Sequence, residues 1–529
     1  MFGRGDCHLS KYKQTFLQGT LILLAAGMIN RLLGFVPRIT LPRIIGSEGV
    51  GLFQMGYPLM GVVLTITTGG IPLAVSKLVA EAASEGNEKR VRGILQVALA
   101  VTAGLSLLFS AACALAAPWM TSRLFTDDRI FWSFLAMTPI IPLAGVSAVF
   151  RGYFQGRHNM IPTAVSQIVE TMIRIVTMLA FAYALLPRGI EYAAAGAMIG
   201  VLVGELGGLL VLLLQLRANR PRQPVYGTAR IGQSRLSGRM NAIKRIFRIS
   251  IPVTGSRLVG SSSYFLESIL IIHGLAAAGI ATSVATSQYG ALQGMIIPIV
   301  YLPSALTYSL AVSLIPSLSE AAARKDQATI HKRLHQSLRL ALVSGAPFAV
   351  LMFVLADPIC YFLYKQADIG IMLKMIAPIA LFLYFKVPLE AALQALNRPG
   401  TALLNTFIGA VVKLALLSLL VSNPSFGILG AVMAFCVTTA VVTLLDWSSI
   451  SRLLKFSLPG GDLLKIFAAM LVMGGSCRLV MDATWIAQPF HRFLLSCLLG
   501  IGIYLVSIVL LKVVDRDDFK KLPWLSRRL

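Results

Sequence analysis

The chain has 529 residues, of which 56% are hydrophobic and only 13% are charged. A soluble domain carries about 25% charged residues, so most of this surface does not face water. The formal net charge of +25 comes from basic residues in short runs between apolar segments, with no aromatic residues interleaved in a basic face. That pattern is typical of membrane topology and excludes nucleic acid as an expected partner.

Apolar segments of about 20 residues, each long enough to cross a bilayer, follow one another along the whole chain. In chain order they are 15–36, 50–71, 93–117, 130–150, 161–186, 192–216, 249–273, 289–313, 337–356, 373–395, 401–421, 427–447, 463–482 and 491–513. The sequence therefore predicts an all-α membrane protein of about fourteen transmembrane helices.

The basic residues of the loops divide unevenly between the two sides of these segments. If both termini lie in the cytoplasm, 33 Lys and Arg residues fall on the cytoplasmic side and 9 on the other. Cytoplasmic loops are the ones that carry the excess of basic residues. We therefore expect both termini to be cytoplasmic, and we expect the chain to bind membrane lipids.

Sequence matches in the two halves predict an internal repeat. The run Arg31-Leu-Leu-Gly34 recurs as Arg257-Leu-Val-Gly260, and the pairs Gln155 and Gln394, and Arg174 and Lys413, are each 239 positions apart. A unit of six helices keeps both copies in the same orientation, as in parallel-repeat transporters. The predicted parts are a six-helix lobe (1–216), a basic cytoplasmic linker (217–248), a second six-helix lobe (249–447), and two additional helices with a basic tail (448–529). Two such lobes suit alternating access.

Charged residues inside the apolar segments are candidates for function, because each costs about 2.5–3.5 kcal/mol at the bilayer centre. Glu170 and Arg174 are four residues apart on one helix, as are Lys386 and Glu390. Each pair is either a structural ion pair or part of an ion-coupling site. The same two readings apply to two further acids, Glu205 and Glu267.

Arg31 and Arg257 occupy matching positions of the repeat. Two arginines in a wet central cleft would suit a pyrophosphate, because guanidinium binds phosphate oxygens in a bidentate manner. Alternatively, each arginine pairs with a distant acid, such as Arg257 with Glu267 or Glu205. We assign three more basic residues to the same cleft: Arg38, Arg43 and Lys413. Arg38 and Arg43 would extend a cationic path outward or bind lipid phosphates at the interface.

The chain contains none of the usual enzyme signatures: no P-loop, no His-Glu-x-x-His and no Gly-x-Ser-x-Gly. Its six cysteines include no Cys-x-x-Cys pair, and most fall in apolar segments. We therefore expect no catalytic residues, no cofactor and no metal site.

Several longer stretches carry a family resemblance. They are Lys13–Leu23, Ile44–Leu52, Ser76–Ala82, Arg151–Arg157, Gly189–Met198 and Thr254–Ser261. Over nearly its whole length the chain resembles the multidrug/oligosaccharidyl-lipid/polysaccharide flippase superfamily, and within it the sporulation branch of the polysaccharide biosynthesis proteins.

The resemblance implies a flippase in the plasma membrane of a sporulating bacterium. Its substrate would be an undecaprenyl-pyrophosphate-linked sugar such as lipid II, needed for spore cortex peptidoglycan. In the related lipid II flippases, arginines of the first, second and eighth helices matter, and Arg31 fits the first of these. The chain departs from them at Val36-Pro37 and Arg38, and it has no charge between Gln288 and Ser319.

Two other functions stay open at this point. One is a cation-coupled multidrug exporter of the same superfamily, and the other is a non-transporting membrane scaffold for cell-wall synthesis. Cationic drugs would prefer an acidic cleft, whereas the charges at the repeat-related positions are arginines. We expect a monomer, with cell-wall synthesis enzymes as possible partners.

Overall fold

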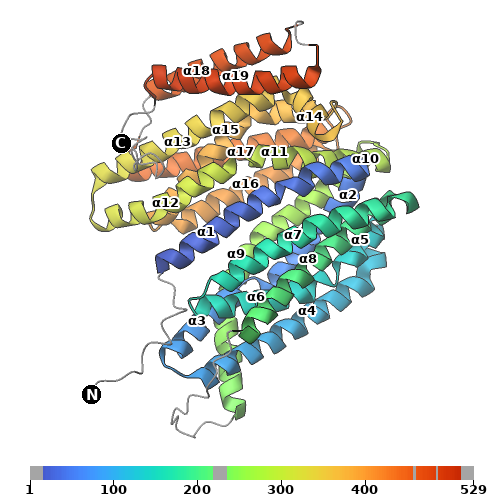
Figure 1. Ribbon diagram of the computed structural model, residues 1–529, viewed down its shortest axis with the longest axis vertical. Coiled ribbons are helices and arrows are strands. Elements are labelled where there is room, and N and C mark those ends of the chain that lie inside the picture. The colour runs from blue at the N-terminus through green and yellow to red at the C-terminus, as the bar shows by residue number, and fades with distance from the viewer. Residues whose placement is uncertain (1–15, 219–234, 457–459, 484–486, 514–529) are drawn as a thin grey trace. The chain divides into compact units, whose positions relative to one another are not determined.

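The computed structural model describes residues 16–218, 235–456, 460–483 and 487–513 (Figure 1). Its contacts divide the chain into two compact units, Met1–Gly294 and Met295–Leu529. Every element formed by the described residues is a helix. The prediction of an all-α protein is confirmed.

Unit 1 contains eleven helical elements. They are α1 (Phe16–Leu33), α2 (Phe35–Thr68), α3 (Ile71–Ser84), α4 (Glu88–Leu124), α5 (Ile130–Met137), α6 (Ile140–Gly156), α7 (Ile161–Leu185), the 3-10 turn η1 (Leu186–Arg188), α8 (Ile190–Ala218), α9 (Arg235–Ala277) and α10 (Thr282–Gly290). The predicted linker lies partly outside the described residues, at 219–234, as do the ends of the chain at 1–15 and 514–529. Residues 235–248, also predicted as linker, form the first turns of α9.

A π-helical turn, η2 (Ala291–Ile296), follows α10 and contains the boundary between the units. The helices of unit 2 are α11 (Ile297–Tyr301), α12 (Ser304–Ala323), α13 (Gln327–Val354), α14 (Ala356–Tyr364), α15 (Gly370–Ala395), α16 (Pro399–Leu420), α17 (Ile428–Leu454), α18 (Gly460–Met481) and α19 (Pro489–Leu510). Within this unit α18 and α19 run side by side (Figure 1). The division of the chain into repeated lobes at 216 and 249 stays a prediction.

Among the described residues, 12 helical stretches are long and apolar enough to cross a membrane, and up to 13 if the bent pair Thr282–Tyr301 and Ser304–Ala323 counts as one span. The first stretch, Ala25–Ser84, is 60 residues long and contains most of the first two predicted spans. The exact number of fourteen stays a prediction, whereas the multi-pass membrane class is clear.

The exposed surface of these helices is apolar, as expected where lipid is the solvent. In α19 the side chains of Leu498, Leu505 and Leu510 are exposed, whereas Ser496 and Gly500 are buried against the protein. Membrane helices pack through small residues in this way, because burying leucine against protein gains nothing over lipid.

Glycine and proline set the breaks in the helices. Gly46, with φ of 67°, kinks α2, and Gly69 and Gly70 separate α2 from α3. Pro303 lies in the break between α11 and α12, where the segments Thr282–Tyr301 and Ser304–Ala323 are bent by 52°. Proline lacks the backbone donor that would continue the helix, and a positive φ is easily adopted only by glycine. In membranes such breaks are tolerated where protein or a water-filled cavity satisfies the backbone.

The closest helix pair of unit 1 is α7 and α8, which run side by side (Figure 1). Along α8 a glycine recurs every fourth residue, at Gly196, Gly200, Gly204 and Gly208. A Cβ added at Gly204 would lie 2.5 Å from Cβ of Arg174, and one at Gly208 would lie 2.9 Å from Cβ of Glu170. The glycine stripe therefore brings the two helices together where α7 carries its charges.

Candidate functional site

Three of the predicted substrate-binding arginines lie in the first two helices of unit 1. Arg31 is in the last turn of α1, and Arg38 and Arg43 are in the first part of α2, before the kink at Gly46. All three side chains are exposed. The structure therefore presents three guanidinium groups on the surface of one apolar stretch, Ala25–Ser84.

Arg257 lies on α9 and bonds to the break in α2. Its Nη1 donates to the carbonyl oxygen of Gly69 at 2.7 Å, and the backbone N–H of Gly70 donates to Oγ1 of Thr254 at 3.1 Å. A cation at the end of a helix stabilises the carbonyls that have no intrahelical partner. Arg257 is otherwise exposed, and a guanidinium has five N–H donors. It can therefore hold this break and still donate to a ligand.

A cluster of four charges joins α6, α7 and α8. Nη2 of Arg151 lies 2.6 Å from Oε2 of Glu170 and 3.9 Å from Oε1 of Glu205. Nη1 of Arg174 lies 3.4 Å from Oε1 of Glu170, one helical turn away on α7. Both carboxylates are buried, so the two arginines balance two acids inside the protein. Sequence analysis did not count Arg151 among the charges inside apolar segments, because its predicted segment ends at residue 150 and its partner Glu170 lies 19 residues away.

A second cluster of polar groups joins α15, α16 and α17 in unit 2. Asp446 on α17 is buried, and Nδ2 of Asn405 on α16 donates to its Oδ1 at 2.9 Å. Lys386 and Glu390 on α15 lie close enough for their charges to act on Asp446. Sequence analysis named Lys386 and Glu390 but missed Asp446, which lies in the last turns of a long apolar helix. Lys413 lies further along α16.

Glu267 on α9 is also buried, and Nε2 of Gln293 donates to its Oε1 at 3.3 Å. Gln293 lies in η2, so a side-chain amide of that turn is a hydrogen-bond partner of Glu267.

A polar network at the far end of unit 1 was also missed by sequence analysis. Asp127, in the connection between α4 and α5, accepts hydrogen bonds from Arg129 at 2.9 and 3.0 Å and from Oγ1 of Thr286 on α10 at 2.8 Å. Arg129 also lies 2.7 Å from Oε1 of Glu48 on α2. Burial raises the pKa of Asp127, but the hydrogen bonds from Arg129 and Thr286 outweigh it and leave this pKa below its ordinary value.

The same end of the unit brings α2 and α10 together. The hydroxyl groups of Ser47 and Ser287 lie 2.6 Å apart. Gly51 and Gly290 face each other so closely that a Cβ on either would overlap backbone atoms of the other helix. This seam, defined by Ser47, Gly51, Ser287 and Gly290, is closed in the structure.

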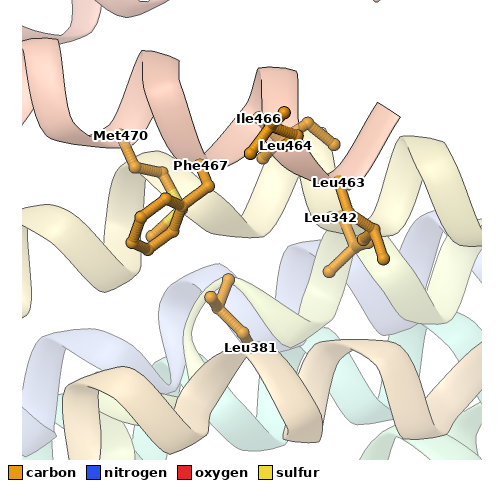
Figure 2. Close-up of a pocket in the computed structure, with 7 residues that line it drawn as sticks. All are labelled: Leu342, Leu381, Leu463, Leu464, Ile466, Phe467 and Met470. Carbon is orange, nitrogen blue, oxygen red and sulfur yellow. The ribbon is translucent and has the colours of Figure 1, made fainter. Parts of the chain in front are cut away.

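An apolar pocket of about 440 Å³ lies in unit 2 between α13, α15 and α18 (Figure 2). Its seven lining residues are all apolar: Leu342, Leu381, Leu463, Leu464, Ile466, Phe467 and Met470. A pocket of this kind, in a helix bundle whose surface is lipid-facing, suits a hydrocarbon chain and not a polar ligand.

In the part of the chain that the structure describes, no three His, Cys, Asp or Glu side chains lie close enough together to bind a metal ion. Five cysteines, Cys113, Cys360, Cys436, Cys477 and Cys497, are free thiols that are buried or half-buried. Cysteines in such surroundings act as small apolar residues.

The helical membrane fold, the buried charges and the exposed arginines together define a multi-pass membrane transporter. The model of the polysaccharide biosynthesis protein family matches residues 16–322, and the MatE family model matches residues 290–419. The chain belongs to the polysaccharide biosynthesis proteins of the multidrug/oligosaccharidyl-lipid/polysaccharide flippase superfamily. The resemblance stated from the sequence is confirmed.

Two curated relatives come from Bacillus subtilis (strain 168). The stage V sporulation protein B is 38% identical over 527 residues, covering 97% of this chain and 99% of the relative. The lipid II flippase MurJ is 25% identical over 421 residues, or 76% of each chain. Among solved structures, an inward closed conformation of the lipid II flippase MurJ matches 93% of this chain and 99% of its own, with a TM-score of 0.70 and 17% identity. It shows the fold alone. By name, the second relative and the solved structure are flippases.

Proposed function

We propose that this protein moves an undecaprenyl-pyrophosphate-linked oligosaccharide across the plasma membrane of a sporulating bacterium by alternating access. The substrate would be a precursor of the lipid II type for spore cortex peptidoglycan. The names of the relatives support this: one is a sporulation protein, 38% identical over nearly the whole chain, and another is a lipid II flippase.

The observation that carries the proposal is the set of exposed arginines in the apolar helices of unit 1. Arg31, Arg38 and Arg43 are exposed on α1 and α2, within an apolar stretch. Each is costly in hydrocarbon, and an anionic headgroup offsets that cost. Arginine also binds phosphate oxygens in a bidentate manner, whereas lysine acts as a point charge. A pyrophosphate is therefore the ligand that these groups fit best.

Arg257 completes the proposed pyrophosphate site, with Arg31 as its counterpart in the sequence repeat. Its hydrogen bond to Gly69 leaves further N–H groups to donate. This bond would also join ligand binding to the break between α2 and α3. Lys413 remains a proposed member of the cleft.

Within unit 2, the pocket between α13, α15 and α18 offers an apolar surface of the kind that a prenyl chain packs against (Figure 2). Because lipid is as apolar as this surface, the pocket would accommodate the chain by packing and not by a hydrophobic gain. We also propose that both termini are cytoplasmic and that the protein is a monomer. The buried acids and lysines would serve either in ion coupling or as structural ion pairs.

The test is transport by the purified protein in vesicles. A fluorescent prenyl-diphosphate sugar in the inner leaflet is protected from a membrane-impermeant quencher, and a flippase exposes it. We expect Arg31→Ala and Arg257→Ala to reduce the rate of exposure strongly, and Arg31→Lys to retain part of it. Charge-assisted contacts to phosphate contribute about 1.5–3 kcal/mol each, which is roughly a 10- to 150-fold loss.

Arg324→Ala is the matched control. Arg324 is an exposed arginine whose Nη2 lies 2.6 Å from Oε1 of Glu320, outside the apolar segments. Its replacement should leave the rate unchanged. Full transport by the Arg31→Ala, Arg257→Ala double variant would overturn the arginine site.

Two outcomes would point to the other functions. Transport of cationic drugs without transport of the lipid-linked sugar would make the protein a multidrug exporter, in line with its match to the MatE family. Transport of neither, with a cortex defect in the deletion strain and no accumulation of lipid-linked precursor, would make it a scaffold.

A further inference from the structure

The ion pair of Arg174 does not explain why this arginine lies inside an apolar helix. Its Nη1 is 3.4 Å from Oε1 of Glu170, one turn away on α7. Glu170 already accepts a hydrogen bond of 2.6 Å from Arg151 on α6. An arginine at the bilayer centre is costly, and a helical pair of this spacing offsets only a small part of that cost. A contact with a ligand would account for the rest.

The guanidinium of Arg174 has more N–H groups than its described neighbours accept. Nη2 donates to Oγ1 of Thr171 at 3.2 Å and Nη1 faces Glu170, whereas a guanidinium has five N–H donors. The side chain is 31% exposed, against 10% for Glu170. A Cβ added at Gly204 would lie 2.5 Å from Cβ of Arg174, so α8 fixes the base of this side chain. The charged end is therefore held in place and still open to a ligand.

Tyr57, on the part of α2 that follows the kink, lies near Arg174. Helices α2 and α7 are in contact, and among the neighbouring charges that act on Tyr57 that of Arg174 is the strongest. The ring of Tyr57 packs on Phe53, with the centroids 5.2 Å apart. Tyr57 is half-buried, so a ligand can approach it. A ligand bound at Arg174 is therefore within reach of a phenol O–H donor.

Arg38 brings a second guanidinium to Tyr57. It lies on the part of α2 that precedes the kink, it is exposed, and its charge also acts on Tyr57. A straight helix would separate these two residues, which are 19 positions apart, by about 28 Å. Gly46, with φ of 67°, lies between them and breaks the helix, so the two parts of α2 can approach. Donors from three segments thus lie near one another: Arg38, Tyr57 and Arg174.

The charges around these donors favour an anion. In the cluster that joins α6, α7 and α8, two arginines balance two acids: Arg151, Arg174, Glu170 and Glu205. Arg38 adds one positive charge to this neutral group, so the balance attracts an anion and repels a cation. Guanidinium groups bind phosphate oxygens in a bidentate manner. Two of them suit the two phosphoryl groups of a diphosphate, whereas a monophosphate engages only one.

We propose that Arg174 and Tyr57, together with Arg38, form a site within unit 1 for the diphosphate of the lipid-linked substrate. The site rests on the proposed function and adds two residues, Arg174 and Tyr57, to the substrate contacts. The two guanidinium groups bind one phosphoryl group each, and the hydroxyl of Tyr57 donates to a phosphate oxygen. Arg174 thus contacts the substrate and is more than a member of an ion pair.

The test is binding of tritiated farnesyl diphosphate and farnesyl monophosphate to the purified protein in nanodiscs of zwitterionic lipid. We expect Arg174→Ala to weaken binding of the diphosphate roughly 10- to 150-fold and Tyr57→Phe roughly 2- to 10-fold, the losses for a charge-assisted and a neutral hydrogen bond. Binding of the monophosphate should weaken much less, because Arg38 still serves a single phosphoryl group. Arg174→Lys should recover part of the loss, since lysine acts as a point charge.

Two further variants separate ligand binding from structural effects. Arg174→Ala with Glu170→Gln keeps the net charge of the native cluster and leaves no Glu170 without its arginine, and we expect its binding of the diphosphate to stay weak. Arg90→Ala is the matched control, because its side chain is 35% exposed and Nη1 lies 2.5 Å from Oε2 of Glu85, outside the proposed site. It should bind both ligands as the native protein does. Thermal unfolding in the same nanodiscs identifies a variant that does not fold, and if Arg174→Ala is one, Tyr57→Phe decides by the same comparison of ligands.

Two results would overturn the site: equal weakening for both ligands in Arg174→Ala, and recovery of native binding when Glu170→Gln is added to it. If Arg31→Ala and Arg257→Ala lose transport while Arg174→Ala and Tyr57→Phe bind the diphosphate as the native protein does, this site fails and the proposed function stands. If the native protein moves no lipid-linked sugar but the variants show the expected losses of diphosphate binding, the proposed function fails and the site stands.

Discussion

The arginines of the unit 1 cluster should contribute very unequally to stability. Replacing Arg151 by Ala leaves two buried carboxylates, Glu170 and Glu205, with Arg174 as their remaining cation. The side chain of Arg151 is 22% exposed, and those of the two acids are 10% and 11% exposed. Removing one partner of a buried ion pair destabilises a protein by about 3–5 kcal/mol.

Arg174→Ala should have a much smaller effect. Its side chain is 31% exposed, its distance to Glu170 is 3.4 Å, and the two residues are one turn apart on α7. Helical pairs of this spacing contribute about 0.3–0.5 kcal/mol. The expected difference between the two variants is therefore several kcal/mol.

The assay is reversible unfolding in mixed detergent micelles, with membrane levels measured in parallel. A variant with both charges removed, Arg151→Met with Glu170→Gln, should recover part of the loss, because it no longer buries an unpaired Glu170. Equal losses for Arg151→Ala and Arg174→Ala, or a loss below about 1 kcal/mol for Arg151→Ala, would refute this account of the cluster.

Three further predictions concern the closed end of unit 1. In a background without the native cysteines, the double variant Ser47→Cys, Ser287→Cys should form a disulfide that blocks transport, and a reductant should restore transport. Unimpaired transport with the disulfide formed would show that the seam need not open. Gly290→Leu should lower the free energy of unfolding by about 1–3 kcal/mol or more, measured in the same micelles, because its side chain would overlap the backbone of α2. Asp127→Asn should lower stability by about 1.5–3 kcal/mol at neutral pH. Folding lowers the pKa of Asp127, so the ionised carboxylate stabilises the native protein relative to Asp127→Asn at pH values above the unfolded pKa of about 3.9. This difference in the free energy of unfolding should disappear as the pH falls through the folded pKa. A difference that does not change with pH would contradict this.

The helical class and most of the helices could be predicted from the sequence, because a spanning helix is set by local composition. The breaks at Gly69-Gly70 and Pro303 coincide with glycine and proline pairs that the sequence shows directly. Pro42 has the same composition signal, yet it lies inside α2, and the kink is at Gly46 instead. Which of several glycines and prolines interrupts a helix depends on the neighbouring helices.

The candidate site could be predicted only in part, for a similar reason. Glu170 and Arg174 are visible as a pair because they are four residues apart on one helix. Arg151 and Asp446 are not, since their partners come from other helices and their importance depends on tertiary packing. Arg257 was assigned to a ligand from its position in the repeat, and its bond to the backbone of Gly69 has no sequence signal.

The close pairing of α7 with α8 bears on how the chain enters the membrane. Only η1 and Gly189 separate the two helices, and the glycine stripe fits α8 against α7, so they can insert as one hairpin. That hairpin carries two acids and one arginine into the lipid. Arg151, on the preceding helix, is synthesised first and is already in place to receive the surplus negative charge. During synthesis, α6 thus serves as the acceptor for the hairpin that follows it. Insertion of the hairpin should be less efficient when Arg151 is absent, even before the rest of the protein has been made.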